Sequence, residues 1–289
     1  MKTKVKISGT IMLGMVLGVS ILFPMEQVTA AAAAEIDPNE IYYMNENEIV
    51  PYAFTNDNET IYYDSKSVTS NETGPTFPCF VNVNSEIHNY CAPLAGTVLV
   101  GYYDRWYESL IPGYSTWVSF GPVSIYSGMS SNDYIQSAFE RLYDLTKTNV
   151  GHAGTTQAAF VDGLNEYVAE NDLQIDYHSV MQGDTINLSV MDTYLDNEVP
   201  VLLLCETYNI VTLIKDEGDR IELSKINSDI AHMMVAYGYE QYSYYRNGVK
   251  FRTDTYLKVA SGVNGGELCY AKLDDDMELV EAWAIEIYE

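Results

Sequence analysis

The stretch CAPLAGTVLVGYYDRWY, residues 91–107, decides the fold. Leu94, Val98, Tyr102 and Trp106 recur at every fourth position, which is the spacing of one face of an α-helix. The residues between them are also mostly apolar or small until the charged pair near the end of the stretch. A helix that is apolar on nearly every side must be surrounded by other elements. The sequence therefore predicts a buried central helix here.

Pro93 fixes where this helix begins. Proline is tolerated in the first turn of a helix and breaks a helix further in, so Cys91 is expected at or just before the N-terminus. A thiol at that place lies next to unpaired amides and partial positive charge, which favour the thiolate over the thiol with its usual pKa of about 8.5. Cys91 is therefore the candidate nucleophile.

A thiol nucleophile also needs a base, and the chain has four histidines. His88 precedes the cysteine on an expected loop, His152 lies in a glycine-rich turn, and His178 lies in a mixed segment. His232 alone opens a long apolar run, HMMVAYGY over 232–239, which predicts a rigid strand. His232 is the best candidate partner for Cys91. If the two do not meet, little else in the chain indicates chemistry.

The remaining pattern predicts helices before Pro200 and strands after it. Helices are expected over 131–146 and from Thr155 or Thr156 to about Glu170. Asn247-Gly248 is a strong hairpin signal because a type I′ turn needs two residues with positive φ. The expected strands are 201–205, 210–214, 220–223, 230–239, 242–246, 249–252, 255–260 and 279–287. Helices followed by an antiparallel sheet predict an α+β domain.

The first thirty residues have the pattern of a secretory signal. Lys2, Lys4 and Lys6 precede an apolar stretch over 7–23, and small residues near Ala30 suit a signal peptidase. An uncleaved anchor is the alternative, although the stretch is marginal for spanning a bilayer. We expect export from a bacterial cell.

Two further regions follow the signal. Residues 31–78 are rich in Asn, Glu, Ser and Thr and could form a polar spacer or N-terminal arm, a strand pair on the main domain, or a propeptide. The spacer or weakly attached arm is the default expectation. Residues 79–289 form the expected main domain.

The charge balance limits the partners. The formal net charge is −26, and removal of the signal, with three lysines and one glutamate, makes it −28. Such a chain repels nucleic acid and anionic lipid, so we expect neither nucleic acid nor a membrane as partner after signal cleavage. The charge serves solubility outside the cell and could attract basic peptides.

Four cysteines remain after the signal: Cys79, Cys91, Cys205 and Cys269. Export permits disulfides, but a working thiol at Cys91 leaves three candidates. Cys205 lies in the apolar run 201–205 and is expected to be a buried core thiol. Cys79–Cys269 is then the one pairing to consider. Cys79–Cys91 is the alternative, and it would remove the nucleophile.

No metal or other cofactor is expected. The acidic run Asp274-Asp275-Asp276 lacks the ligand spacing and the turn glycine of a calcium loop, and is expected to be a solvated turn.

Three motifs in order resemble one enzyme family. NYCAPLAG at 89–96 with GYYDR at 101–105, the helix after Gly154, and HMMVAYGY at 232–239 are similar to segments of papain-like cysteine peptidases. The nearest branch is that of the bacteriocin-leader (double-glycine) peptidases and their secreted bacterial relatives. The resemblance covers roughly residues 79–262. Ala92 stands where that branch usually has glycine.

The resemblance implies a papain-like α+β fold, with a buried N-terminal nucleophile helix and further helices packed on a mainly antiparallel C-terminal sheet. It implies a secreted thiol peptidase that acts on a peptide or protein through Cys91 and His232. Ser261 stands where the family has the Asp or Asn that orients the histidine, and Asn264 just beyond could serve instead. Asn84 could take the place of the family's oxyanion glutamine.

These departures leave two alternatives open. One is a catalytically inactive papain-like binding module. The other is a thiol amidase or transpeptidase, which keeps the acyl-enzyme chemistry and changes the acceptor.

Overall fold

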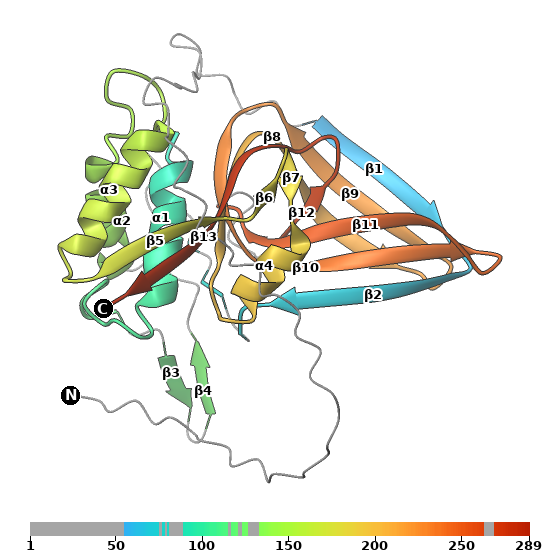
Figure 1. Ribbon diagram of the computed structural model, residues 1–289, viewed down its shortest axis with the longest axis horizontal. Helices are drawn as coiled ribbons and strands as arrows, with labels where there is room; N and C mark the ends of the chain where they lie inside the picture. The colour runs from blue at the N-terminus through green and yellow to red at the C-terminus, as the bar shows by residue number, and fades with distance from the viewer. Residues whose placement is uncertain are drawn as a thin grey trace, which may run out of the picture. The chain divides into compact units, whose positions relative to one another are not determined.

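The computed structural model describes residues 55–74, 77–78, 80, 89–114, 117–120, 123–126, 133–262 and 269–289. This part of the chain is mixed α+β, with four helices and a large, mostly antiparallel sheet (Figure 1), which confirms the predicted class at that level. The helices are α1 Cys91–Tyr103, α2 Asp133–Leu145, α3 Gln157–Ala169 and α4 Leu188–Leu195. The strands of the large sheet are β1 Thr55–Tyr62, β2 Ser65–Glu72, β5 Gln174–Ser179, β8 Val201–Asp216, β9 Arg220–Ser228, β10 His232–Arg246, β11 Val249–Ala260, β12 Cys269–Leu273 and β13 Glu278–Tyr288. Two small hairpins are β3 Trp117–Phe120 with β4 Val123–Tyr126, and β6 Met181–Gln182 with β7 Thr185–Ile186.

Helix α1 is the buried central helix that the sequence predicts. All of its residues after Cys91 are buried. It ends at Tyr103, however, so Trp106 lies beyond the helix and is 45 % exposed rather than buried. The chain turns because the carboxylate of Asp104 accepts the backbone N–H of Ile111 at 2.9 Å.

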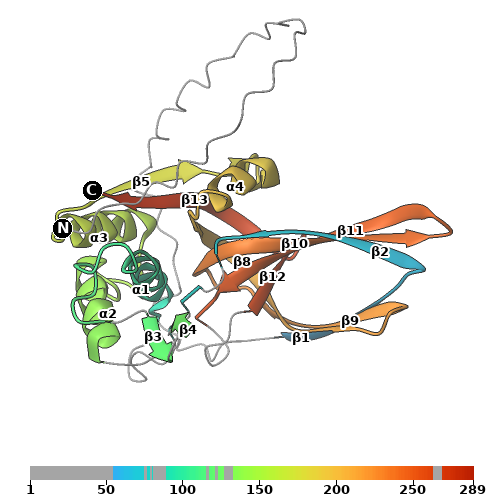
Figure 2. The same cartoon turned by 90° about the horizontal axis from the view of Figure 1, so that it is seen from below.

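Helices α2 and α3 lie beside α1 on one side of the sheet (Figures 1 and 2). Their predicted inward faces are confirmed: Ile135, Ala138, Phe139 and Leu142 of α2 and Phe160, Leu164, Tyr167 and Val168 of α3 are buried. Gly163 lets the two helices approach closely, since a Cβ there would lie 2.6 Å from the backbone nitrogen of Thr146.

The sheet places two long strands at its centre. Its order is β1-β9-β8-β12-β11-β10-β2, and the first halves of β8 and β10 also pair with each other. β13 joins β8 to β5. Leu204 of β8 and Met233 of β10 face α1, whereas Leu203 and Met234 face the opposite core, which includes α4.

The strands are longer than the sequence predicts. The segments 201–205 and 210–214 form a single strand, β8, which continues through the polar Asn209. The buried Asn209 side chain makes the hydrogen bonds that a neighbouring strand would make with the backbone of Lys272. It donates to the carbonyl of Lys272 and accepts the N–H of Lys272. The polar Asn209, which lies between the two predicted segments, therefore does not end the strand.

Residues 55–72 form two strands, so the strand alternative for this segment is the one observed in its described part. β1 and β2 follow each other in the chain but do not pair together. β1 pairs with β9, and β2 pairs with β10. Figure 2 shows β1 and β9 in one layer and β2, β10 and β11 in another.

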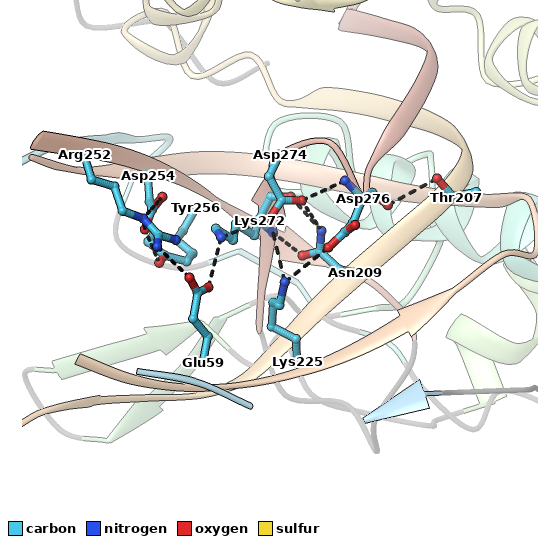
Figure 3. Close-up of polar contacts among 10 residues, drawn as sticks. All are labelled: Glu59, Thr207, Asn209, Lys225, Arg252, Asp254, Tyr256, Lys272, Asp274 and Asp276. Atoms are coloured by element: carbon cyan, nitrogen blue, oxygen red, sulfur yellow. Dashed lines mark hydrogen bonds and ion pairs between the residues drawn. The ribbon is translucent and has the colours of Figure 1, made fainter. Parts of the chain in front are cut away.

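Side chains fill the space between these two layers. Ile61, Tyr63, Ile221, Tyr244 and Tyr256 belong to a small apolar core there. An ion network adjoins it, and it links Glu59 of β1 to Arg252 and Lys272, and Lys225 of β9 to Asp274 and Asp276 (Figure 3). Residues 274–276 form a turn in which Asp275 and Asp276 are exposed, as predicted, and Asp274 and Asp276 also pair with nearly buried lysines.

Candidate functional site

Cys91 is the first residue of α1, as the position of Pro93 predicts. Tyr90 is the N-cap residue and makes no side-chain cap, while its carbonyl accepts the N–H of Leu94 at 3.0 Å. Hydrogen bonding by the backbone N–H groups of Ala92 and Met233 lowers the pKa of the Cys91 thiol. The sulfur therefore receives one donor from its own helix and one from strand β10.

His232 is the first residue of β10 and is only 9 % exposed. Its Nε2 lies 2.8 Å from the backbone carbonyl oxygen of Ser261. A carbonyl only accepts, so Nε2 carries the proton of this hydrogen bond. Nδ1 is then the nitrogen left for Cys91, whose hydrogen bonding and charge raise the pKa of the ring. The structure thus brings the two predicted residues into direct contact.

Tyr208 of β8 completes the surroundings of the imidazole. Its ring stacks on His232 with centroids 4.6 Å apart and an interplanar angle of 25°. Tyr208 is 1 % exposed, so the stack shields one face of the imidazole from water. Sequence reasoning missed this residue, because nothing in the pattern of β8 distinguishes a tyrosine over a histidine from one in the core.

The electrostatics of the pair favour charge separation. Burial raises the pKa of Cys91, but the hydrogen bond and charge of His232 and the two backbone amides outweigh it, so the pKa lies below its ordinary value. Burial lowers the pKa of His232, but the bonds to Cys91 and to the Ser261 carbonyl outweigh it, so the pKa lies above its ordinary value. Both shifts favour a thiolate beside an imidazolium.

A cavity of about 40 Å³ opens at the pair. It is lined by Asn89, Cys91, Ala92, Ala153, Gly154, Thr155, Gln157, Leu204, Ala231, His232 and Met233. The N-terminal residues of both α1 and α3 therefore reach the same space. Apart from Cys91 and His232, the polar residues of the lining are Asn89, Thr155 and Gln157, and the others are apolar or small. The sequence marked the start of α3 but gave no reason to select Gln157.

Of the other residues that the sequence singled out, the structure places one, Ser261, at the site of Cys91 and His232. Ser261 lies at the site, but it reaches His232 through its backbone carbonyl and not through its side chain. Its hydroxyl instead contacts the thiol of Cys269 at 3.2 Å. Asn264 and Asn84 lie outside the described residues, as does His88. His152 contacts the carbonyl of Ala153, a residue of the cavity lining, and His178 pairs with Glu286.

The cysteine predictions need one correction. Cys91, Cys205 and Cys269 are free thiols, so neither Cys79–Cys269 nor Cys79–Cys91 is formed. Cys269 is instead engaged with Ser261 and with the carbonyl of Val259. Cys205 is fully buried as predicted, and burial raises its pKa well above the ordinary value. Cys79 lies outside the described residues.

Two structural searches of the described ranges give negative results. No helix there is both long and apolar enough to cross a membrane. Nor is any group of three or more His, Cys, Asp or Glu side chains in these ranges arranged to hold a metal ion.

Comparisons with known proteins give no relative. No family model matches the chain, and neither the curated proteins nor the solved structures contain a significant match.

Proposed function

We propose that this protein is a secreted cysteine peptidase of papain-like fold, which cleaves peptide bonds through an acyl-enzyme at Cys91. The observation that carries the proposal is that Cys91, at the start of a buried helix, and His232, at the start of a buried strand, line the same cavity, where each shifts the pKa of the other toward the charged form. The shared cavity gives a substrate access to both groups.

The mechanism follows from the two pKa shifts. The Cys91 thiol gives its proton to His232, and the thiolate attacks the carbonyl carbon to form a tetrahedral adduct. The C–N bond then breaks, and the leaving amine takes the proton from the imidazolium. Water attacks the thioester while His232 accepts its proton, and the C–S bond breaks to release the acid. The carbonyl of Ser261 holds the imidazole in place through both steps.

Secretion rests on the sequence of residues 1–30, which has the pattern of a signal peptide. Mass spectrometry of the protein recovered from the culture medium tests it. We expect a mature chain that begins soon after Ala30. A chain that is retained in the cell with an intact N-terminus would contradict export.

The activity is tested with a mixture of random-sequence peptides, with new termini identified by mass spectrometry. We expect cleavage by the native protein, none by Cys91→Ala, and at least a 100-fold loss in His232→Ala. His178→Ala is the matched control, because this half-exposed histidine pairs with Glu286 away from the cavity. Loss of cleavage only in the two site variants supports the proposal. Unchanged cleavage in Cys91→Ala would refute it.

The same experiment separates the acceptor classes. A peptidase adds water and yields free carboxyl termini, whereas a transpeptidase joins the acyl group to an amine. Ligated products in place of free termini would assign the pair to transpeptidation with the same nucleophile.

A further inference from the structure

Gln157 carries an amide that the fold leaves without a partner. It is the first residue of α3, it is 6 % exposed, and it lines the cavity with Cys91 and His232. Among the residues that the structure describes, none forms a hydrogen bond with its side chain. The carboxamide is therefore not used to hold the described part of the fold together, and it is available to a ligand that enters the cavity.

The backbone around Gln157 is firmly held. Thr156 caps α3, its hydroxyl accepting the N–H of Ala159 at 3.1 Å and its carbonyl accepting the N–H of Phe160 at 2.9 Å. Gly163, one turn and a half further on, packs against the backbone at the end of α2. A side chain at the first helical position therefore projects from a fixed point, which is a requirement for precise contact with a substrate.

The chemistry of the cavity indicates what the amide binds. A carboxamide offers two N–H donors and one acceptor, while most of the other walls are apolar or small. When the Cys91 thiolate attacks a carbonyl, negative charge develops on the carbonyl oxygen, and donors in a dry site stabilise that charge. The cavity has room for only a few water-sized groups, so the reacting carbonyl has to sit close to these walls.

We propose that Gln157 is a catalytic residue whose side-chain N–H donates to the carbonyl oxygen of the substrate as the tetrahedral adduct forms. This inference rests on the proposed acyl-transfer function. It assigns the oxyanion donor to α3 rather than to the segment before Cys91, where the sequence predicted Asn84. The unpaired amide is then a feature of the free enzyme that substrate binding removes.

Two probes of Cys91 separate this role from a structural one. p-Nitrophenyl acetate acylates a thiol through a tetrahedral oxyanion, forms the S–C bond of a thioester, and releases p-nitrophenolate. Iodoacetamide alkylates the same thiolate by displacing iodide, with no oxyanion. Both adducts are located by mass spectrometry. A residue that only supports the fold or the thiolate affects both rates, and an oxyanion donor affects only the first.

Gln157→Met is the informative variant because it keeps the length and approximate volume of the side chain and removes both donors. We expect its acylation rate to fall at least about 10-fold, while alkylation of Cys91 stays within about 2-fold of the native rate. Its unfolding midpoint should stay close to that of the native protein, because the carboxamide makes no hydrogen bond within the described part of the fold. Gln136→Met, on the exposed face of α2, is the matched control and should change neither rate.

Equal acylation rates in the native protein and Gln157→Met would overturn the inference while leaving the proposed function intact. Parallel losses in acylation and alkylation would also overturn it, since they indicate a structural role. A native Cys91 that is alkylated but never acylated would overturn the proposed function, and the role of Gln157 with it.

Discussion

The imidazole of His232 is held by an uncharged group. Its Nε2 bonds to the Ser261 carbonyl, and no carboxylate among the described residues is hydrogen-bonded to the ring. A carbonyl fixes the tautomer and the orientation but adds no negative charge to stabilise the imidazolium. The thiolate of Cys91 is therefore the main counter-charge, so each member of the pair depends on the other.

Asp104, at the end of α1, gives a prediction on pH and stability. Burial raises its pKa to about 7, although the N–H of Ile111 works in the opposite direction. Between pH ~4 and ~7 the folded state then holds more protons than the unfolded state, so stability falls as the pH rises through this window. Asp104→Asn keeps the acceptor for Ile111 and removes the ionisation. We expect it to stabilise the protein by ~1–2 kcal/mol at pH 8 and by much less at pH 4.

Urea unfolding of both proteins at the two pH values measures this effect. The difference between the native protein and Asp104→Asn should grow with pH. A difference of the same size at pH 4 and pH 8 would show that the carboxyl titrates normally.

At the residue scale, the sequence predicted the two residues that lie together at the candidate site and missed those that surround them. A cysteine before a first-turn proline and a histidine at the start of an apolar strand each follow from local pattern. The carbonyl of Ser261, the ring of Tyr208 and the amide of Gln157 reach the site from separate elements. Only the tertiary arrangement of α3, β8 and the end of β11 places them there.

At the scale of elements, the contact between α2 and α3 depends on one glycine. A Cβ at Gly163 would lie 2.6 Å from the Thr146 nitrogen and 2.8 Å from the Leu145 carbonyl oxygen, which are backbone atoms that cannot rotate away. Gly163→Ala should therefore destabilise the protein by ~1–3 kcal/mol, despite the better helix propensity of alanine.

Gly96→Ala is the matched control for this prediction. It places a Cβ in the interior of α1 at an ordinary 3.5 Å from the flexible Leu142 side chain. Denaturant midpoints should show a loss for Gly163→Ala and little change or a gain for Gly96→Ala. Equal effects would mean that the helix pair relaxes without cost.

The sequence predicted the helices better than the strands, for a physical reason. Helical periodicity is local, and the inward faces of α2 and α3 were read directly from it. The strands are set by pairing with distant segments. β8 runs through a polar gap because Asn209 bonds to β12, and β1 and β2 form because long hairpins offer them edges. No local segment of the sequence shows which distant strand it will pair with.

At the scale of the whole molecule, residues 55–72, which precede α1, are built into the sheet. β1 and β2 cover the outer edges of β9 and β10, and the ion network ties β1 to β11 and β12 through Glu59 (Figure 3). Although burial opposes it, the bonds and charges of Arg252 and Lys272 lower the pKa of Glu59. The ion pairs of Glu59 therefore stabilise the fold at pH values above the unfolded pKa of ~4.3. This stabilisation is lost as the pH falls through the lower pKa of the folded state.

Glu59→Gln tests the contribution of these ion pairs, because it removes the charge of the side chain and keeps its shape. We expect a loss of ~1 kcal/mol at pH 7 and faster hydrogen exchange in β1, with both differences shrinking at acidic pH. Glu222→Gln is the control, since its pair with Arg220 is half-exposed and lies outside the network of Glu59. Unchanged exchange in β1 would show that its backbone pairing with β9 alone secures the segment.

The central claim is that Cys91 and His232 form a thiolate–imidazolium pair, and titration of the ultraviolet absorbance of the thiolate tests it most directly. The difference spectrum between the native protein and Cys91→Ala isolates this sulfur. The account predicts an ionisation midpoint below the ordinary value of ~8.5, which moves upward in His232→Ala. A midpoint at or above ~8.5 that is the same in both proteins would contradict the account.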